Sequence, residues 1–421
     1  MCRPSSSAFD GSQQHDDEDQ ENQLPFPWHL DVFDAHCHPT ETMASLADAL
    51  PSMRATALVI MATRSQDQHL VFEAAAAAAA VSEKSCRLIP SFGWHPWFSH
   101  QLYDDGDAGP HATFRPPPLP DDGDALHQAK KAHYHAVLFP TPEDDFVRAL
   151  PTPTPLSSCI AATRARLCEI PHALVGEAGL DKAFRVPRPW GPPAASSRDT
   201  GLTPGGREGR LLSPYRVRMP HQQAVLTQQL RLAAAEGRPV SLHGVQAHGT
   251  LYDTVSACWK GFERRVPSRR ERRHNQAEAP ASSSENDSKG EGEGESAPKP
   301  YPPRICLHSF SGSVELLSQW MQPSIPADIF VSFSAAINLG AGDSTVARAK
   351  LDPVVRAVPD DRILVESDLH QAGPSMDDAL ERMYRTVCAV KGWPLDDGVR
   401  RIGRNFRRFV FGGLSRDDQK R

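Results

Sequence analysis

The sequence has no pair of cysteines at the CxxC spacing of many metal and redox sites, although 8 of its 421 residues are cysteine. Several cysteines lie inside apolar runs, so we expect reduced thiols in a cytoplasmic or nuclear protein. No apolar run is long enough to cross a bilayer, and residues 1–22 lack the apolar segment of a secretory signal. We therefore expect no association with membranes.

An excess of positive charge is also missing, because the formal net charge is -6. The bulk composition therefore gives no signature of nucleic-acid binding, although it leaves room for a local basic groove. Hydrophobic residues make up only 39% of the chain, and its 38 prolines cluster in stretches typical of loops. We expect the folded core to be smaller than the full chain.

Five polar or proline-rich stretches flank or interrupt the rest of the sequence. They are an acidic N-terminus expected to be disordered (1–28), three insertions at about 101–155, 185–219 and 260–303, and a polar tail (412–421). The third insertion has too little apolar surface to offset its ordering entropy, so we expect disorder there. Its basic cluster Arg269–Arg273 fits a nuclear-localisation signal, but a solvated charge run is the preferred interpretation.

Residues 29–411 otherwise alternate between strand-like and helical runs. The expected strands are His29–His38, Ala55–Thr63, Cys86–His95, Ala173–Gly179, Pro239–His243, Arg304–Phe310, Ile329–Ile337 and Arg362–Asp368. The expected helices are Glu41–Leu50, Asp67–Ser82, Ala161–Glu169, His221–Glu236, Val314–Met321, Ala347–Ala357, Met376–Val390 and Leu395–Phe411.

About eight strand–helix units is the number found in a (β/α)8 TIM barrel. Periodicity alone does not separate this fold from a doubly wound sheet, but polar residues after most of the strands favour the barrel. We predict a single α/β barrel domain with disordered or irregular insertions. Each insertion follows a strand, so we expect all three on the catalytic face, where they would cover the site or recruit protein partners.

The segment Asp34-Ala35-His36-Cys37-His38 ends the first apolar run. Side chains alternate along a strand, so His36 and His38 should point to the same side. Two neutral imidazoles aimed at one point make half of a metal site.

Further ligand-type residues stand at the ends of later strands. Glu177 lies between glycines on an apolar strand, where a buried carboxylate is unfavourable unless a cation or hydrogen bonds neutralise it; the alternative is a buried salt bridge. His243, His308 and Asp368 each close an apolar run, and Glu366 shares a face with Asp368. The series predicts a metal centre at the mouth of the barrel.

Four imidazoles and two carboxylates suit two divalent cations that share a bridging carboxylate. Such a pair lowers the pKa of a bound water, and a nearby carboxylate takes the proton, so the pattern predicts hydrolysis without a redox cofactor. His95, in Gly93-Trp94-His95-Pro96, fits either a substrate contact or a structural role. Trp97 and His370 are expected to line the same pocket.

With these motifs in view, the chain resembles the TatD family of metal-dependent deoxyribonucleases, within the amidohydrolase-type TIM barrels. The resemblance spans roughly residues 29–411 without the insertions. It rests on Asp34-Ala35-His36-Cys37-His38, Gly93-Trp94-His95-Pro96, Gly176-Glu177-Ala178-Gly179-Leu180-Asp181, His243, His308-Ser309-Phe310-Ser311-Gly312, Glu366-Ser367-Asp368 and Arg404-Asn405-Phe406.

The resemblance implies a role for each matching residue. His36, His38 and Asp368 would hold one metal, Glu177 would bridge, and His243 with His308 would complete the second site. Asp368 would also accept the proton of the water, while Glu366 and Asp34 would orient ligands as a second shell. His95 would face the substrate phosphate. The implied activity is hydrolysis of phosphodiester bonds, of the 3′–5′ exonuclease type on DNA, with Zn, Mg, Mn or Co as the metal.

Three positions depart from the family pattern. Val245 stands where the family usually has Arg, Trp97 where it often has a second His, and Leu369-His370 where it usually has Ser/Ala-Pro. The missing arginine removes a charge-assisted phosphate contact. The sequence thus predicts metal chemistry more firmly than DNA as the substrate, and it suggests a divergent eukaryotic subgroup.

Two other functions remain open. One is an amidohydrolase that cleaves a small C–N or ester substrate; many such barrels use a carboxylated lysine where this chain has Glu177, which disfavours that function. The other is a catalytically weak protein that works as an interaction partner through its insertions. The changes at Val245 and Trp97 fit such a protein.

Overall fold

The computed structural model describes residues 24–80, 86–106, 112–118, 123–190, 198–267, 299–340 and 345–412. Its main sheet has eight parallel strands in the order β1-β2-β3-β7-β9-β10-β11-β12. They are β1 (Phe33–Cys37), β2 (Ala57–Met61), β3 (Arg87–Phe92), β7 (Leu174–Asp181), β9 (Val240–Val245), β10 (Arg304–Leu307), β11 (Asp328–Ser334) and β12 (Ile363–Glu366). Each coincides with a strand expected from the sequence.

The sheet curls until its first and last strands meet. The backbone N–H of Asp368 donates to the His36 carbonyl at 3.0 Å, and the N–H of His38 donates to the Leu369 carbonyl at 2.8 Å. The Asp34 carboxylate strengthens this seam by accepting from the Ser367 N–H at 3.0 Å. The strands therefore form a nearly closed barrel, which confirms the predicted TIM fold over the doubly wound alternative.

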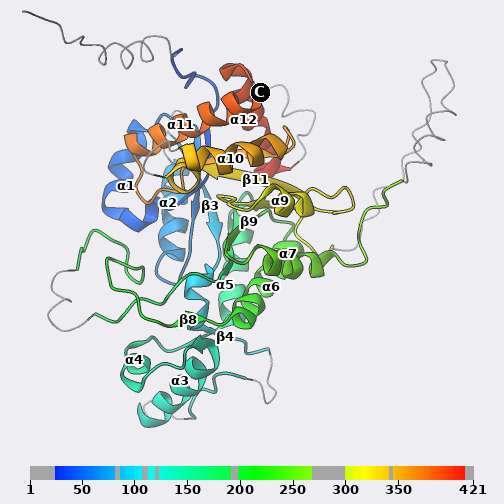
Figure 1. Ribbon diagram of the computed structural model, residues 1–421. Coiled ribbons are helices and arrows are strands. Elements are labelled where there is room, and N and C mark those ends of the chain that lie inside the picture. The colour runs from blue at the N-terminus through cyan, green and yellow to red at the C-terminus, as the bar shows by residue number, and fades with distance from the viewer. Residues whose placement is uncertain are drawn as a thin grey trace, which may run out of the picture.

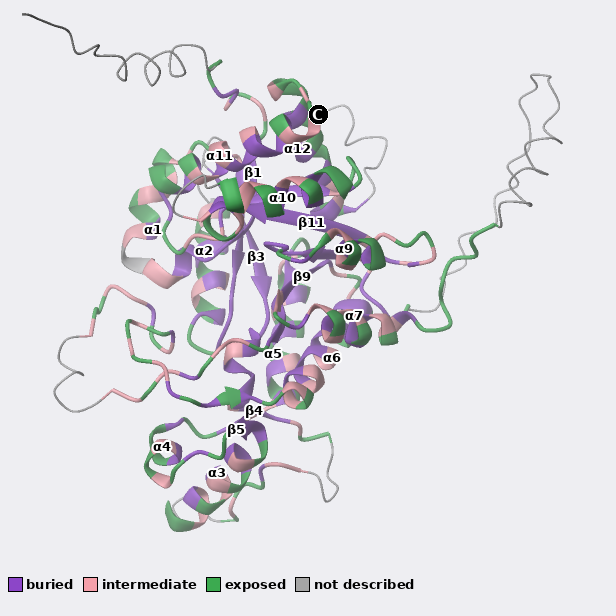
Figure 2. Ribbon diagram, viewed as in Figure 1, coloured by how far each residue is buried: buried purple, intermediate pink, exposed green. Residues whose placement is uncertain are grey.

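Helices surround the barrel (Figure 1). They are α1 (Met43–Ala49), α2 (Gln68–Ala80), α5 (Leu156–Glu169), α6 (Met219–Ala235), α7 (His248–Ser256), α9 (Val314–Trp320), α10 (Thr345–Ala357), α11 (Pro374–Lys391) and α12 (Leu395–Phe411). The strands lie buried inside this ring, while the outer faces of the helices are exposed (Figure 2). All five residues of β2 are buried, as expected for a parallel strand covered on both faces.

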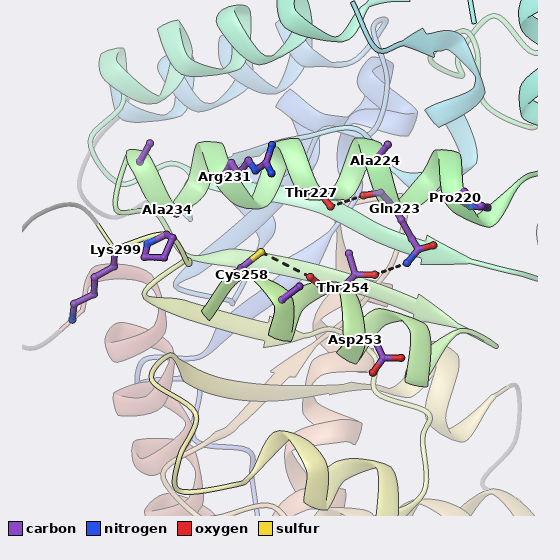
Figure 3. Close-up of a pocket in the computed structure, with 13 residues that line it drawn as sticks. Pro220, Gln223, Ala224, Thr227, Arg231, Ala234, Asp253, Thr254, Cys258 and Lys299 are labelled. Carbon is purple, nitrogen blue, oxygen red and sulfur yellow. Dashed lines mark hydrogen bonds between the residues drawn. The ribbon is translucent and has the colours of Figure 1, made fainter. Parts of the chain in front are cut away.

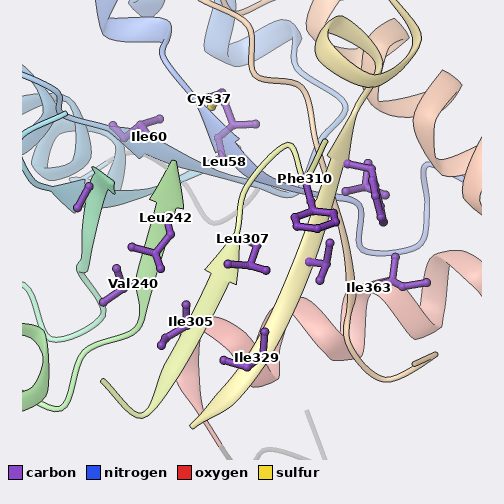
Figure 4. Packing of buried hydrophobic residues seen from close by; sticks show 14 of the residues in the cluster. Cys37, Leu58, Ile60, Val240, Leu242, Ile305, Leu307, Phe310, Ile329 and Ile363 are labelled. Atoms are coloured by element: carbon purple, nitrogen blue, oxygen red, sulfur yellow. The ribbon is translucent and has the colours of Figure 1, made fainter. Parts of the chain in front are cut away.

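Two apolar clusters hold the barrel together. The larger lies between strands and helices, and Figure 4 shows part of it, including Leu58, Leu242 and Leu307. The smaller joins alternate strand residues such as Val59 with residues of α12. In that cluster the ring of Phe33 stacks on Phe406 with centroids 4.2 Å apart. Helix α12 therefore closes the end of the barrel at which the strands begin.

The first insertion is not irregular, which corrects the expectation from the sequence, whereas the described part of the second holds little regular structure besides one short strand. Residues 101–155 include α3 (Gly123–Val137) and α4 (Asp144–Ala149), with the short strands β4 (Leu102–Tyr103), β5 (Leu138–Phe139) and β6 (Thr154–Pro155). Strand β5 pairs with β8 (Arg216–Val217) of the second insertion. Tyr134, Val147, Val186 and Tyr215 form a small core between them. We call residues 102–155 the helical lobe; α3 and α4 lie at the bottom of Figure 1, opposite α12.

The N-terminal boundary also differs from the prediction. The sequence predicts that Phe26 belongs to a disordered N-terminus, but in the structure Phe26 is buried against Trp28 and Tyr384. The ordered domain therefore begins at least three residues before His29. Residues 1–23, 268–298 and 413–421 lie outside the described residues, so the expected disorder of most of the third insertion stays a prediction. Its expected position is wrong, because the insertion follows α7 rather than a strand, and its described ends contact Asp328 at the amino end of β11 instead of the catalytic face. Among the described residues, no helix has the length and apolarity that a membrane span requires.

Candidate metal centre at the carboxyl ends of the strands

Glu177 lies at the centre of the predicted ligand set, on β7, and only 2% of its surface is exposed. The glycines around it allow β7 to approach its neighbours closely. Gly179 has φ +156°, and a Cβ there would lie 2.1 Å from the His243 carbonyl oxygen on β9. A side chain at position 179 would force β7 away from β9, so glycine is required to keep Glu177 next to His243.

One carboxylate oxygen of Glu177 faces the histidines of β1 and the loop that follows it. Oε2 lies 3.4 Å from His36 Nε2 and 3.3 Å from His38 Nε2. Those two imidazole nitrogens are 3.2 Å apart. Asp368, just after β12, places Oδ1 3.6 Å from His38 Nε2 and 4.0 Å from His36 Nε2. The structure thus brings His36, His38 and Asp368 around Glu177 Oε2.

The other oxygen of Glu177 faces three more imidazoles. Oε1 lies 2.7 Å from His243 Nδ1, 2.9 Å from His308 Nε2 and 3.1 Å from His95 Nε2. These side chains come from the carboxyl ends of β9, β10 and β3. All seven residues of the centre therefore converge from separate parts of the barrel, although the chain spreads them widely.

Second hydrogen bonds identify which imidazole nitrogens would be available to a metal. His36 Nδ1 lies 2.9 Å from Ser241 Oγ, and His308 Nδ1 lies 3.1 Å from Glu366 Oε1. His243 Nε2 lies 3.2 Å from Asp181 Oδ2. A carboxylate only accepts, so the outer nitrogens of His243 and His308 carry a proton, and the inner nitrogens face a second acceptor, Glu177. A cation in place of the inner proton would be bound by that inner nitrogen while the outer N–H stays on its carboxylate; a serine hydroxyl allows the same arrangement for His36. This donor set of nitrogens and carboxylate oxygens fits a divalent cation.

His95 has the opposite arrangement. Its Nδ1 accepts a hydrogen bond of 3.1 Å from the backbone N–H of Trp97. A neutral ring must then carry its proton on Nε2, the nitrogen that faces Glu177. His95 therefore presents an N–H donor to the centre, whereas the inner nitrogens of His243 and His308 would be available to a cation, because a carboxylate holds the outer N–H of each ring.

Charges around Glu177 and Asp368 keep both carboxylates ionised. Burial raises the pKa of Glu177, but the neighbouring imidazoles of His95, His308 and His36 outweigh this and hold the pKa well below its usual value. Burial acts likewise on Asp368, yet the hydrogen bond with His38 and the adjacent imidazoles lower its pKa to about 2. Both carboxylates are therefore negatively charged at neutral pH, as metal ligands must be.

Glu366 and Asp34 both accept hydrogen bonds from predicted ligands or from the residues next to them. Glu366 Oε1 accepts from the backbone N–H of Ser309 at 2.8 Å as well as facing His308. Asp34 Oδ1 accepts from the backbone N–H of His36 at 3.0 Å. Burial raises the pKa of Asp34 to about 7, although hydrogen bonds from Ser367 and His36 oppose the shift. Asp34 therefore joins the first and last strands directly, which the sequence analysis did not foresee.

Two substrate-side predictions fall in different environments. Trp97 follows β3 in a short 3-10 helix, η3 (Pro96–Gln101); its indole Nε1–H donates to Asp181 Oδ2 at 2.6 Å, and its ring stacks on Phe184. His370 is exposed at the rim, with its ring centroid 5.4 Å from that of His38. Val245, at the end of β9, is half-buried.

Sequence reasoning missed Asp181, Ser241 and Ser309 as partners of the ligands. Ser241 precedes His243 by two residues on β9, so the alternation of side chains was a signal that could have found it. Asp181 ends the Gly176–Asp181 motif and was quoted there without a role. Nothing in the sequence indicates that Ser309 donates to Glu366, because that contact depends on the pairing of β10 with β11 and of β11 with β12.

A cavity of about 780 Å³ lies elsewhere, between α6 and α7 on the outside of the barrel (Figure 3). Its walls include Gln223, Thr254 and Cys258, and none of its lining residues is a predicted ligand. The dashed lines in Figure 3 mark contacts within and between these two helices. This cavity is therefore separate from the metal centre.

Comparisons with known proteins cover nearly the same part of the chain. Residues 33–411 match the family model for TatD related DNase. Cut9-interacting protein scn1 of Schizosaccharomyces pombe is 36% identical over 380 residues, covering 90% of this chain and 98% of that protein. Uncharacterized deoxyribonuclease YMR262W of Saccharomyces cerevisiae is 25% identical over 392 residues, with coverage of 90% and 99%. The crystal structure of YJJV, a TatD homologue from Escherichia coli, aligns with a TM-score of 0.45 and 16% identity, covering 91% and 98%.

Proposed function

Since the chain belongs to the TatD-related DNase family, a family of metal-dependent hydrolases, we propose that it cleaves phosphodiester bonds of DNA at the centre around Glu177. One observation carries the proposal. The two oxygens of Glu177 divide the surrounding imidazoles into two groups, with His36 and His38 on one side and His243 and His308 on the other. A carboxylate placed in this way suits the bridge between two cations.

The residues of each group would hold one ion. The first ion would be held by His36, His38 and Asp368, and the second by His243 and His308. Glu177 would contact both ions. Bound divalent cations lower the pKa of a water and stabilise negative charge on the attacking and leaving oxygens. The metals that such nitrogen and oxygen ligands accept include Zn, Mn, Mg and Co.

Asp368 would accept the proton of the attacking water. Its side chain is 12% exposed, compared with 3% for Glu177, so solvent and substrate reach it more easily. With a pKa of about 2 it is ionised across the physiological range, and a bound cation would make the water acidic enough to pass its proton to this weak base. The N–H that His95 presents would donate to a phosphate oxygen of the substrate, while Trp97 and His370 would line the path of the DNA.

The direction of cleavage in the proposal is 3′–5′ from a DNA end, as in the family that the chain resembles. The name of the Saccharomyces cerevisiae relative, a deoxyribonuclease, supports DNA as the substrate. The name of the Schizosaccharomyces pombe relative, a Cut9-interacting protein, favours a second candidate, in which this chain also binds a protein partner through its insertions. Either activity fits a protein of the cytoplasm or nucleus.

The test compares two aspartates. Asp368→Asn should lower DNA cleavage by at least about 100-fold, because an amide does not accept the proton of the water. Asp378→Asn, which changes an exposed aspartate on α11, should cleave DNA like the wild type. Cleavage of 3′- and 5′-labelled single strands is followed with Mg, Mn, Zn or Co, and elemental analysis gives the metal content. Full activity of Asp368→Asn would contradict the mechanism.

A protein partner would leave a different pattern. If binding through the insertions is the main function, wild-type protein saturated with each metal should show no cleavage above a chelated control. Deletion of residues 268–298 should then weaken partner binding while the metal content stays the same.

A further inference from the structure

A second cavity, of about 260 Å³, is lined in part by Trp97, whose ring lies 4.7 Å from that of His95 at the edge of the metal centre. Its walls come from Trp97 and Phe98 of η3, from Leu150 at the end of α4, and from Val186 and Arg210 of the second insertion. The volume is slightly below the range of about 300–1,000 Å³ that is usual for small-molecule sites, so it suits a ligand of modest size. Apart from η3 and Gln66, which follows β2, these walls belong to the two insertions rather than to the barrel.

Arg64 fixes the second insertion to the rim of the metal centre. Its guanidinium donates to the carbonyls of Pro204 and Thr203 at 2.9 and 3.1 Å, and also to Glu41 Oε2 at 2.8 Å. Glu41 follows His38 by three residues, and its own carbonyl accepts from Thr203 N–H at 2.9 Å. The loop that carries Arg210 is therefore tied to the segment directly after the first two predicted ligands.

Trp97 belongs to both the metal centre and this cavity. Its ring lies 4.7 Å from that of His95 and stacks on Phe184 at the same distance, with an interplanar angle of 9°. The hydrogen bond from Nε1 to Asp181 fixes the orientation of the ring. Phe184 covers one face of the indole, so a nucleobase would stack on the opposite face, and such stacking needs no particular base sequence.

Arg210 supplies a positive charge without a carboxylate partner. Its guanidinium is only partly exposed and donates to the carbonyls of Gly206 and Arg207, the latter at 3.2 Å. Glu208, the nearest acidic residue along the loop, pairs with Arg198 instead. Among the described residues, no carboxylate lies within ion-pair distance of Arg210. Glu208 attracts Arg210 from beyond ion-pair distance, and within the part of the chain that the structure describes the guanidinium otherwise contacts only backbone carbonyls and the ring of Trp190, 5.9 Å away. A partly buried cation without a direct carboxylate contact favours an anionic ligand.

We propose that this cavity binds the nucleotide next to the scissile phosphate, with its base against Trp97 and its far phosphate on Arg210. The proposal rests on the proposed phosphodiesterase function and deepens it, because it names the chemical class that the insertions recognise. The guanidinium of Arg210 would then supply part of the phosphate binding that the uncharged side chain of Val245 does not provide. The expected preference is for a substrate that extends one phosphate beyond the bond that is cleaved.

The experiment measures kcat/KM for two dinucleotides. One is the thymidine dinucleotide with a single internal phosphodiester, and the other carries an additional phosphate at each end, so that either polarity of cleavage is covered. Wild-type protein should prefer the phosphorylated dinucleotide by about 10- to 100-fold, the range of a charge-assisted hydrogen bond. Arg210→Gln should bring this ratio close to one, with unchanged metal content, and Arg210→Lys should retain part of the preference.

Arg207→Gln is the matched control. Arg207 lies in the same loop, is exposed, and donates to the Arg210 carbonyl at 3.3 Å, but does not line the cavity, so its variant should keep the wild-type ratio. Because each ratio compares two substrates of one protein, partial unfolding or metal loss cancels. A wild-type ratio near one, or an equal ratio in Arg210→Gln, would refute the subsite while cleavage itself still supports the phosphodiesterase. Cleavage of neither dinucleotide nor DNA would refute the phosphodiesterase and the subsite with it.

Discussion

Two groups of buried histidines in this protein differ in what their ring nitrogens face. In the metal centre, both ring nitrogens of His243 and of His308 face carboxylates, with Glu177 on the inner side of each ring. In the helical lobe, His133 is fully buried as well, but Nε2 lies 2.9 Å from the His100 carbonyl and Nδ1 lies 2.9 Å from Thr113 Oγ1. Both nitrogens of His133 are therefore already occupied within the protein.

Burial alone consequently does not distinguish a ligand from a structural histidine. The informative feature is a ring nitrogen that faces a shared, ionised carboxylate after the other ring nitrogen has found its own partner. The charge that surrounds the histidines also differs between the two groups. Burial and the neighbouring His133 and His221 lower the pKa of His100 to about 3, whereas Glu177 and Asp368 give the metal centre two negative charges.

The largest expected effect comes from Glu177→Gln, which removes the charge shared by both halves of the centre. Loss of a second-shell partner typically lowers metal affinity or activity by about 10- to 100-fold, and we expect a larger loss for this bridging residue. Isothermal titration with Zn or Mn measures the affinity, and DNA cleavage measures the activity. Retention of two tightly bound ions per chain would show that Glu177 does not bridge.

Asp181→Asn should have an intermediate effect, because Asp181 holds the outer nitrogen of His243 and also accepts from Trp97. An amide in its place allows the wrong tautomer of His243, so we expect metal affinity on the Oε1 side of Glu177 to fall by about 10- to 100-fold. The melting temperature without metal should change little by comparison. Unchanged affinity for both ions would mean that Asp181 serves substrate binding alone.

His133→Gln tests the other group. It breaks the contacts with Thr113 and the His100 carbonyl, so the free energy of unfolding should decrease by about 1–3 kcal/mol. Metal content should match the wild type, because His133 contacts none of the predicted ligands. Denaturant titration measures the stability, and elemental analysis of the same preparation measures the metal content. A loss of metal would contradict the assignment of His133 to the structural histidines.

A smaller effect concerns pH. Burial lowers the pKa of His133 to about 4 and that of His100 to about 3, whereas the unfolded chain has a value near 6.5. As the pH falls below about 6.5, these two histidines bind protons in the unfolded chain but not in the folded protein. The free energy of unfolding is therefore greatest above pH 6.5 and decreases toward pH 4. The protection factors of the α3 backbone amides, which correct for the intrinsic exchange rate at each pH, should decrease over this window. The decrease should be smaller in His133→Gln. A wild-type lobe equally protected at pH 7 and pH 5 would contradict this.

The eight strands were predictable because each is a short apolar run buried on both faces, and the ligand positions followed from the ends of those runs. Helix α7 was missed because His248–Ser256 is short and begins with residues typical of a loop. The helical lobe was missed because prolines and charged residues dominate 101–155, while its core uses Val186 and Tyr215 from a distant insertion. The division of ligands between the two oxygens of Glu177 depends on the register of β7 against β9, which has an irregularity between Val175 and Ala178.

The seam between β1 and β12 also has a consequence for protein synthesis. His36 and His38 leave the ribosome early, but Asp368 and the seam partner of Asp34, Ser367, follow more than 300 residues later. Helix α12, whose Phe406 covers the base of the barrel, emerges later still. Because domains generally fold as units during translation, a nascent chain should hold an open sheet edge and lack Asp368 until β12 and the residues after it are made, and its base should stay uncovered until α12 is released. Premature termination before residue 395 should therefore yield an aggregation-prone fragment rather than a weaker enzyme.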